Sequence, residues 1–238
     1  MKKAIGIAVL FTALLWVIQS AAVLFHFNQA MFGLQPLNVA SLWGIFTAPL
    51  VHGGYEHLFN NTLPMIILLA MLWYGYPNTR GRVFSVIWIV SGVGVWLFAR
   101  TSTHLGASGL THGLFFFLFT VSLFRRDKRS VVLMMIAFFM YGGMVMTIFP
   151  REPGISYEYH FFGALAGFIS ALIWHRQDPK FVSKQYAWET EGYEDDDIRR
   201  IGDEWKIDHQ HAHGHDERHG HSQGHGHRHD HHHQRHHH

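Results

Sequence analysis

The sequence contains no cysteine, which excludes disulfide bonds and thiolate catalysis. Long apolar runs are almost absent from residues 177–238 but fill residues 1–176, so the hydrophobic fraction of 48% averages two different regions. The first region is typical of a membrane protein and the second of a polar tail. The net charge of +2 is small, and the basic residues lie in short clusters between apolar runs, which indicates membrane topology and not nucleic-acid binding. No sequence unit repeats, so a repeat architecture is not supported.

Six segments approach the length of about 20 apolar residues that a helix needs to cross a bilayer. They cover residues 4–25, 58–75, 83–99, 107–124, 131–149 and 159–175. The first segment lacks a convincing small-residue cleavage site, so we interpret it as a retained span and not as a signal peptide. The predicted fold is all-α, a polytopic bundle of six transmembrane helices with a disordered C-terminal tail. The predicted domains are a membrane domain (1–176), an acidic and aromatic cytoplasmic linker (177–208) and a histidine-rich tail (209–238).

Basic residues near the span ends predict the orientation, because Lys and Arg gather in cytoplasmic loops. Those on the N-terminal side are Lys2, Lys3, Arg80, Arg82, Arg125, Arg126, Lys128, Arg129, Arg176 and Lys180. The opposite loops carry only Arg100 and Arg151, and loop 26–50 has neither Lys nor Arg. We therefore expect both termini in the cytoplasm, in a bacterial inner membrane. Apolar and aromatic residues of loop 26–50 are expected to lie in the outer interface as short amphipathic pieces: Phe32, Leu34, Leu37, Leu42, Trp43 and Phe46.

Polar and ionisable residues at membrane depth are costly, so each is a functional candidate. Seven of them lie near the starts of the second, fourth and sixth spans: His52, His57, Asn61, Ser108, His112, Glu158 and His160. In the predicted topology, all seven belong to the outer half of the bundle. Three helices that are distant in sequence thus bring hydroxyl, imidazole and amide groups to one depth, which predicts a polar site near the outer face.

Ser108 and His160 are the candidate nucleophile and base of this site. Ser108 lies between Gly106 and Gly109, which allow a tight backbone approach and leave the hydroxyl accessible. A serine hydroxyl becomes a good nucleophile only when a neighbouring base takes its proton, and His160 lies at the matching depth. The alternatives are that Ser108 only packs a helix contact and that His160 is an interfacial histidine.

Glycines predict that the fourth and sixth spans approach closely. Gly163 and Gly167 follow His160 at offsets of three and seven, on the same helix face as the histidine. The fourth span carries its own small pair, Gly109 and Gly113. Two glycine faces permit close backbone contact, which a serine–histidine hydrogen bond of about 2.6–3.2 Å would require.

His57 and Asn61 lie four residues apart on one face of the second span. Both side chains can donate hydrogen bonds, so with the Ser108 amide they could stabilise an oxyanion. The alternative is a polar pair that holds two helices together. His52 is separated from this helix by Gly53 and Gly54, so we expect it to lie in a loop or behind the site.

Glu158 is two residues from His160 and would point about 200° away on a helix. We therefore expect an exposed interfacial carboxylate there, and no acidic partner for the imidazole.

Together these motifs resemble those of the rhomboid intramembrane proteases. The matching patterns are His52-x4-His57-x3-Asn61, Gly106-x-Ser108-Gly109 and His160-x2-Gly163-x3-Gly167, within residues 1–176. The resemblance implies a Ser108–His160 dyad with no acidic third member, no required cofactor, and an oxyanion site of His57, Asn61 and backbone amides. It also implies substrates that are single membrane-spanning helices with small residues at the cut.

The sequence departs from the family pattern at three positions. Bacterial members often have Trp-Arg in the first loop, where this chain has Trp43-Gly44. A tyrosine that stacks on the catalytic histidine commonly follows the serine by four, and here that residue is His112. The residue before the histidine is usually small, but here it is Tyr159. An imidazole at position 112 could still stack, and Tyr159 could replace the lost ring.

From His209 onward, fifteen of thirty residues are histidine, many of them alternating as in His209, His211, His213 and His215. Neutral imidazoles bind Zn²⁺, Ni²⁺ or Cu²⁺, so the tail is a candidate metal site, while none is expected in the membrane domain. The alternative is a polar tail with some engineered histidines at its end.

Two rival functions remain open on the sequence. A metal-ion transporter with a histidine-rich regulatory tail would explain the tail, but the spans contain no interior pair of carboxylates. A catalytically weak relative that only binds membrane helices could lose Ser108 or His160, and this chain retains both.

Overall fold

The structure, a computed structural model, describes residues 1–150 and 156–180. The long helices in these ranges are α1 (Lys2–Leu24), α3 (Tyr55–Gly75), α4 (Arg80–Phe98), α5 (Ser108–Arg125), α6 (Lys128–Tyr141) and α7 (Tyr157–Trp174). The short elements are α2 (Gly44–Thr47) and the 3-10 helices η1 (Gln29–Phe32), η2 (Val39–Ser41), η3 (Ala48–Leu50) and η4 (Gly142–Ile148). Within the described ranges, β-structure is limited to one isolated β-bridge between Leu34 and His104. The prediction of an all-α fold is confirmed.

The described residues all belong to one compact unit. The predicted linker beyond residue 180 and the predicted histidine-rich tail lie outside the described residues, as does Arg151 of the outer loops.

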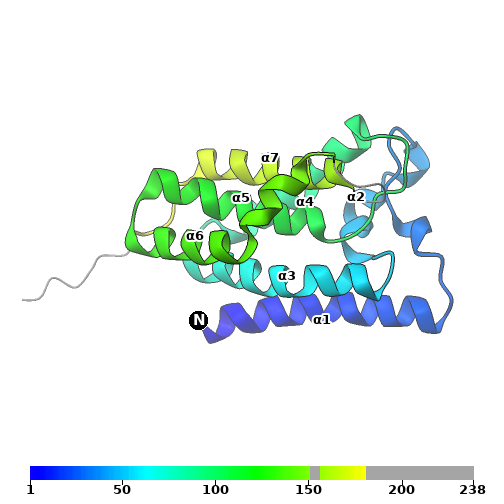
Figure 1. The fold of residues 1–238 in the computed structure, drawn as a ribbon, viewed down its shortest axis with the longest axis horizontal. Coiled ribbons are helices and arrows are strands. Elements are labelled where there is room, and N and C mark those ends of the chain that lie inside the picture. The colour runs from blue at the N-terminus through cyan, green and yellow to red at the C-terminus, as the bar shows by residue number, and fades with distance from the viewer. Residues whose placement is uncertain (151–155, 181–238) are drawn as a thin grey trace, which may run out of the picture. The chain divides into compact units, whose positions relative to one another are not determined.

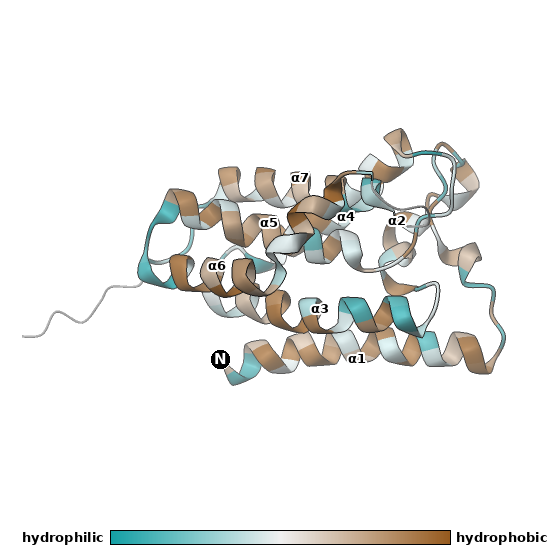
Figure 2. Cartoon of the chain, viewed as in Figure 1, coloured by the Kyte–Doolittle hydropathy of each residue, from teal (hydrophilic) through white to brown (hydrophobic). Residues whose placement is uncertain are grey.

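Five helical segments in the described ranges are long and apolar enough to cross a bilayer: Lys2–Leu24, Tyr55–Gly75, Arg80–Phe98, Ser108–Arg125 and Lys128–Ile148, the last comprising α6 and η4. The sixth predicted span, α7, is not among them because its first turn carries the polar residues Glu158 and His160. Many large apolar side chains on the helices are exposed. Figure 2 shows apolar residues along the helices and polar ones gathered at the start of α3 and in the loops.

Helix α5 forms the centre of the bundle, with α7, α6, α3 and α4 packed around it, while α1 lies against α3 (Figure 1). Leu114, Phe117 and Leu118 on α5 are almost completely buried. The surface of α5 is covered on most sides, whereas most of the segment formed by α6 and η4 is exposed. Ser108, the first residue of α5, is therefore carried by the most constrained helix.

The close contact between α5 and α7 that the glycine pattern predicted is present. A Cβ atom on Gly163 would lie 2.1 Å from the carbonyl oxygen of Gly109, and one on Gly167 would lie 2.0 Å from that of Gly113. Both distances are far below any van der Waals contact, so only glycine allows this approach. The contact sets α5 and α7 in register at the ends that carry Ser108 and His160.

Loop 26–50 packs against the loop between α4 and α5. Leu34 exchanges two backbone hydrogen bonds of 2.8 Å with His104, and its side chain is completely buried. The expectation of an interfacial position is therefore wrong for Leu34, whereas Phe32, Leu37, Leu42, Trp43 and Phe46 are exposed.

A backbone contact explains the glycine after Trp43 in this loop. A Cβ on Gly44 would lie 2.6 Å from the carbonyl oxygen of Gly33. The Trp-Arg pattern common in bacterial rhomboid proteases would not fit this packing, because the arginine would collide with the backbone at Gly33.

At the opposite end of the bundle, the segment after α7 is bound to the helices. The buried Arg125 guanidinium donates to the carbonyl oxygens of His175, Asp178 and Pro179. The Asp178 carboxylate accepts hydrogen bonds from the Asn78 amide and the Thr79 hydroxyl. Residues 177–179, which the sequence assigned to the linker, are thus packed against the membrane domain.

Candidate active site

A cavity of about 940 Å³ opens where α3, α5 and α7 begin and where α6 passes into η4. Helices α3, α5 and α7 start at the same end of the bundle (Figure 1), which explains why residues far apart in sequence meet there. The cavity brings together the predicted site residues Ser108, His160, His57, Asn61 and His112. Gly106, Gly109, Gly163 and Gly167 instead shape the backbone around it.

The backbone that leads into Ser108 is held on both sides. Gly106 has a φ of +110°, a conformation that L side chains rarely adopt, and its N–H donates to the Ala48 carbonyl at 2.8 Å. A Cβ on Gly106 would lie 2.5 Å from Cε1 of His57, so that ring covers the glycine directly. The sharp turn at Gly106 thus places Ser108 at the start of α5 with its hydroxyl on the cavity.

His52 binds the same turn from the protein side. Its ring is completely buried, and Nε2 accepts a hydrogen bond of 3.2 Å from the Ala107 N–H. Burial, followed by the neighbouring His57, lowers the pKa of His52 to about 3 against an opposing effect of the Leu50 carbonyl. His52 is therefore neutral at physiological pH, which the hydrogen bond from Ala107 requires.

The His160 ring lies at the start of α7 with one nitrogen bound to a carbonyl. Nδ1 is 3.0 Å from the Thr147 carbonyl oxygen, which can only accept, so Nδ1 carries the hydrogen. In the neutral ring, Nε2 then has a free lone pair, as a general base needs. Between the described residues Ser108 and His160, no direct hydrogen bond is formed, although both side chains line the cavity.

His112 stacks on His160, with ring centroids 3.9 Å apart and ring planes within 8°. Its Nδ1 is 2.7 Å from the Ser108 carbonyl oxygen, and its Nε2 is 2.7 Å from the Thr147 hydroxyl. The Tyr159 ring is also buried, but it packs against Gly109. Of the two candidates, His112 thus occupies the stacking position and Tyr159 does not.

The expectation of an exposed Glu158 is wrong. Glu158 is buried, because α7 packs against α4 at this point and its carboxylate meets the end of α4. One carboxylate oxygen lies 3.2 Å from Nε of Arg100 and accepts a hydrogen bond from the Arg100 backbone. The carboxylate is thus engaged by Arg100, and His160 has the Thr147 carbonyl as its Nδ1 partner.

His57 and Asn61 lie on the cavity wall formed by α3. The Asn61 amide donates one hydrogen bond of 3.0 Å to the His57 carbonyl oxygen, which leaves its second N–H for another acceptor. The His57 ring meets the His52 ring edge to face at 5.2 Å. The Ser108 amide lies in the first turn of α5, where N–H groups have no partner within the helix.

The rhomboid-domain family model matches residues 39–177, from η2 to just beyond α7. The chain belongs to the rhomboid family. An uncharacterized protein of Mycobacterium bovis and one of Mycobacterium tuberculosis are each 31% identical to it over 172 residues, which are 68% of this chain and 72% of the relative. An uncharacterized protein of Mycobacterium leprae is 30% identical over 178 residues, 71% of this chain and 70% of the relative.

Membership makes this rhomboid a multi-pass membrane protein of a family of intramembrane proteases, which act on membrane-protein substrates within the bilayer. Membership in the rhomboid family also disfavours the hypothesis of a metal-ion transporter. Within the described ranges, no group of three or more His, Cys, Asp or Glu side chains lies close enough together to hold a metal ion.

The sequence motifs did not identify Thr147, which lines the cavity and contacts His112 and His160. The signal that could have found it is a hydroxyl residue in an otherwise apolar segment, five and four residues after Gly142 and Gly143. These glycines mark the point at which α6 becomes the 3-10 helix η4. Hydropathy counts the whole segment as one span and does not reveal the change of helix type.

Proposed function

We propose that this rhomboid is an intramembrane serine endopeptidase in which Ser108 is the nucleophile and His160 the general base. The observation that carries the proposal is the cavity of about 940 Å³ that both side chains line with His57 and Asn61. Three helices contribute a candidate nucleophile, a candidate base and hydrogen-bond donors to one cavity. A cavity built only for helix packing would not need this combination.

In the first step, the Ser108 oxygen attacks the carbonyl carbon of the scissile peptide bond. The hydroxyl proton moves to Nε2 of His160, and the carbonyl π electrons move to its oxygen. The missing direct contact between the two side chains is not an obstacle, since such hydrogen bonds are often long before substrate binds. The developing negative charge lies within reach of the Ser108 amide, His57 and the second N–H of Asn61, which act as an oxyanion site.

In the second step, the C–N bond breaks and His160 gives its proton to the leaving amine, which leaves an acyl ester on Ser108. A water molecule then attacks this ester while His160 takes one of its protons. Collapse of the intermediate releases the carboxyl product, and the proton returns to the Ser108 oxygen. His160 thus serves as base and acid in turn.

The proposed substrates are single membrane-spanning helices with small residues at the cleavage point, as the resemblance to rhomboid proteases implies. The cavity lies at the end of the bundle where α3, α5 and α7 begin, whereas the clusters of Lys and Arg lie at the other end. Positive residues favour the cytoplasmic side, so cleavage takes place near the outer face of a bacterial inner membrane. Because the chain has no cysteine, single cysteines at Asn28 and Asn78 test this orientation: a membrane-impermeant maleimide should label the first in intact cells and not the second.

The decisive experiment is labelling of the purified protein in detergent with a fluorophosphonate, which reacts with activated serines. Wild type should be labelled and should cleave a model transmembrane substrate in proteoliposomes, and Ser108→Ala should do neither. Ser102→Ala is the matched control, because Ser102 lines the same cavity and has no role in the mechanism.

Labelling of Ser108→Ala at the wild-type rate, or cleavage by it, would refute the nucleophile. A wild-type protein that binds the substrate helix with neither labelling nor cleavage would instead support the relative that only binds membrane helices.

A further inference from the structure

Thr147 contacts both stacked imidazoles of the site. Its carbonyl oxygen is 3.0 Å from Nδ1 of His160, and its hydroxyl is 2.7 Å from Nε2 of His112. The two rings are parallel within 8° at 3.9 Å. One residue thus fixes the rotation of the candidate base and that of the ring stacked on it.

The contact with His160 has a chemical consequence. When His160 takes the serine proton it becomes an imidazolium, and the hydrogen on Nδ1 gains positive charge. The Thr147 carbonyl oxygen carries partial negative charge and already accepts that hydrogen. It therefore holds the tautomer that leaves Nε2 free, and it stabilises the charged ring, as the carboxylate of a catalytic triad does.

The contact with His112 keeps the stacked ring in place. Nδ1 of His112 faces the Ser108 carbonyl oxygen, so this nitrogen carries the hydrogen and neutral His112 accepts from the Thr147 hydroxyl at Nε2. Two stacked imidazolium ions would repel each other, so His112 must stay neutral when His160 is charged. The Thr147 hydroxyl hydrogen has two acceptors within reach, Nε2 of His112 at 2.7 Å and the Met144 carbonyl oxygen at 2.9 Å. When His112 is neutral, Nε2 can only accept, so the hydroxyl hydrogen turns to the imidazole and supplies the donor that this ring requires.

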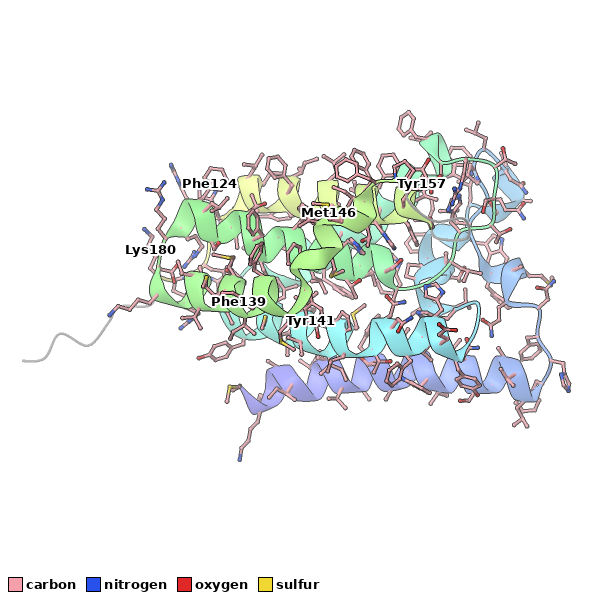
Figure 3. The ribbon with its side chains drawn as sticks, in the orientation of Figure 1. Phe124, Phe139, Tyr141, Met146, Tyr157 and Lys180 are labelled. Atoms are coloured by element: carbon pink, nitrogen blue, oxygen red, sulfur yellow. The ribbon has the colours of Figure 1, made fainter. Side chains whose placement is uncertain are left out.

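Thr147 lies on η4, which follows α6 and contacts both α6 and α7. Figure 3 labels Tyr141, the last residue of α6, and Met146, which precedes Thr147 on η4. Met144 and Val145 of η4 pack against the hydrophobic core, and Thr147 adds the polar contacts with the two imidazoles. The orientation of His160 thus depends on whether η4 is docked.

We infer that Thr147 is a positioning residue that orients the base His160 through its carbonyl and, through its hydroxyl, the stacked ring of His112. The inference rests on the proposed function, because it assigns a role in a reaction of Ser108 and His160. A catalytic triad has an acidic third residue that this dyad lacks, and the inference assigns its orienting role to Thr147 of η4.

The test compares Thr147→Val, which loses the hydroxyl but keeps the shape and the carbonyl, with Thr147→Ser, which loses the γ-methyl group but keeps the hydroxyl and the carbonyl. We expect Thr147→Val to lower kcat and the rate of fluorophosphonate labelling about tenfold, with little change in KM, and we expect Thr147→Ser to restore both rates to within about twofold. Thr103→Val is the control, because Thr103 lines the same cavity and its hydroxyl binds Gln35, away from the imidazoles. Melting temperatures in detergent identify any variant that fails to fold.

A double-mutant cycle with His112→Phe tests whether the hydroxyl acts through His112. Phenylalanine keeps a ring for stacking but removes both hydrogen bonds, so adding Thr147→Val should cause little further loss. Full labelling and kcat in a folded Thr147→Val, or additive losses in the cycle, would overturn the inference while Ser108 remains the nucleophile. Absence of labelling and cleavage in wild type would refute the proposed function and the inference with it.

Discussion

Four imidazoles surround the segment that carries Ser108, and each has a different partner. His52 accepts the Ala107 amide, His57 covers Gly106, His112 contacts the Ser108 carbonyl and His160 contacts the Thr147 carbonyl. His52 and His112 thus hydrogen-bond the backbone on either side of Ser108 and the His57 ring covers Gly106, while His160 is the proposed base. Neutral imidazole suits this environment because it offers one donor and one acceptor without a charge to desolvate.

The oxyanion roles proposed for His57 and Asn61 predict graded losses of activity. Loss of one such donor costs about 10²–10³ in kcat in other hydrolases. We expect Asn61→Ala and His57→Ala to lower kcat, though less than His160→Ala does, because the Ser108 amide and the other donor remain. Steady-state cleavage of a model substrate in proteoliposomes measures this, and wild-type kcat in both variants would show that the donors lie elsewhere.

The lowered pKa of His52 predicts that the folded protein loses stability in acid. In the unfolded chain it titrates at its ordinary pKa of 6.5, but burial lowers the pKa to about 3 in the folded protein, so between these values only the unfolded state binds the proton. The contribution of neutral His52 to the free energy of unfolding is complete above pH 6.5. It is lost as the pH falls toward 3, at up to about 1.4 kcal/mol per pH unit. His52→Gln keeps an acceptor for the Ala107 amide but does not titrate. Its melting temperature should fall less between pH 7 and 4 than that of wild type, and parallel curves would contradict the prediction.

At the scale of elements, the contact between α5 and α7 determines the site. Backbone meets backbone at Gly109–Gly163 and at Gly113–Gly167, which brings the starts of the two helices together. Small residues at such interfaces allow close van der Waals packing where no hydrophobic force acts between helices. The register of this contact sets the depth of Ser108 relative to His160.

Gly163→Ala should therefore separate the two helices. Its Cβ would lie 2.1 Å from the Gly109 carbonyl oxygen, and backbone cannot yield as a flexible side chain does. Overpacking of this kind costs roughly 1–3 kcal/mol and should abolish most activity.

Gly81→Ala is the matched control in α4, because a Cβ there meets nothing within 4 Å. Helix propensity favours alanine by about 0.8–1.0 kcal/mol, so this variant should be as stable as wild type or more so. Melting temperatures and cleavage rates of the two variants decide the point, and equal behaviour would mean that the α5–α7 contact tolerates a methyl group.

At the scale of the whole molecule, the polar groups divide between two ends of the bundle. The cavity with its histidines lies at one end, and the buried network of Arg125, Asp127 and Asp178 lies at the other. Asp127 caps the start of α6 and pairs with Arg125 at 2.9 Å. Lys180, the last described residue, lies at the end opposite the start of α7 (Figure 3).

This separation predicts that the histidine-rich tail does not take part in catalysis. Deletion of residues 209–238 should leave cleavage in detergent nearly unchanged in metal-free buffer, because the positive-inside rule predicts a cytoplasmic tail and a site near the outer face. Calorimetric titration with Zn²⁺ should detect binding by the full chain and none by the truncated chain. Equal binding by both would place the metal site in the membrane domain.

The family and much of the candidate site could be predicted from the sequence. Long apolar runs and rare polar residues are local signals, since any polar group at membrane depth must have a reason to be there. The motifs around Ser108, His160, His57 and Asn61 therefore pointed to one depth and one family before any contact was known. Their catalytic roles remain proposals that the variants above test.

Other features depended on contacts between distant segments, which no local pattern encodes. The burial of Glu158 and the choice of His112 over Tyr159 as the stacking ring follow from how α7 packs on α4 and α5. The contact of Thr147 with His160 requires that α6 change to a 3-10 helix at Gly142 and turn its end over the cavity. Hydropathy sets which residues enter the membrane, but helix packing and hydrogen-bond geometry decide which of them meet.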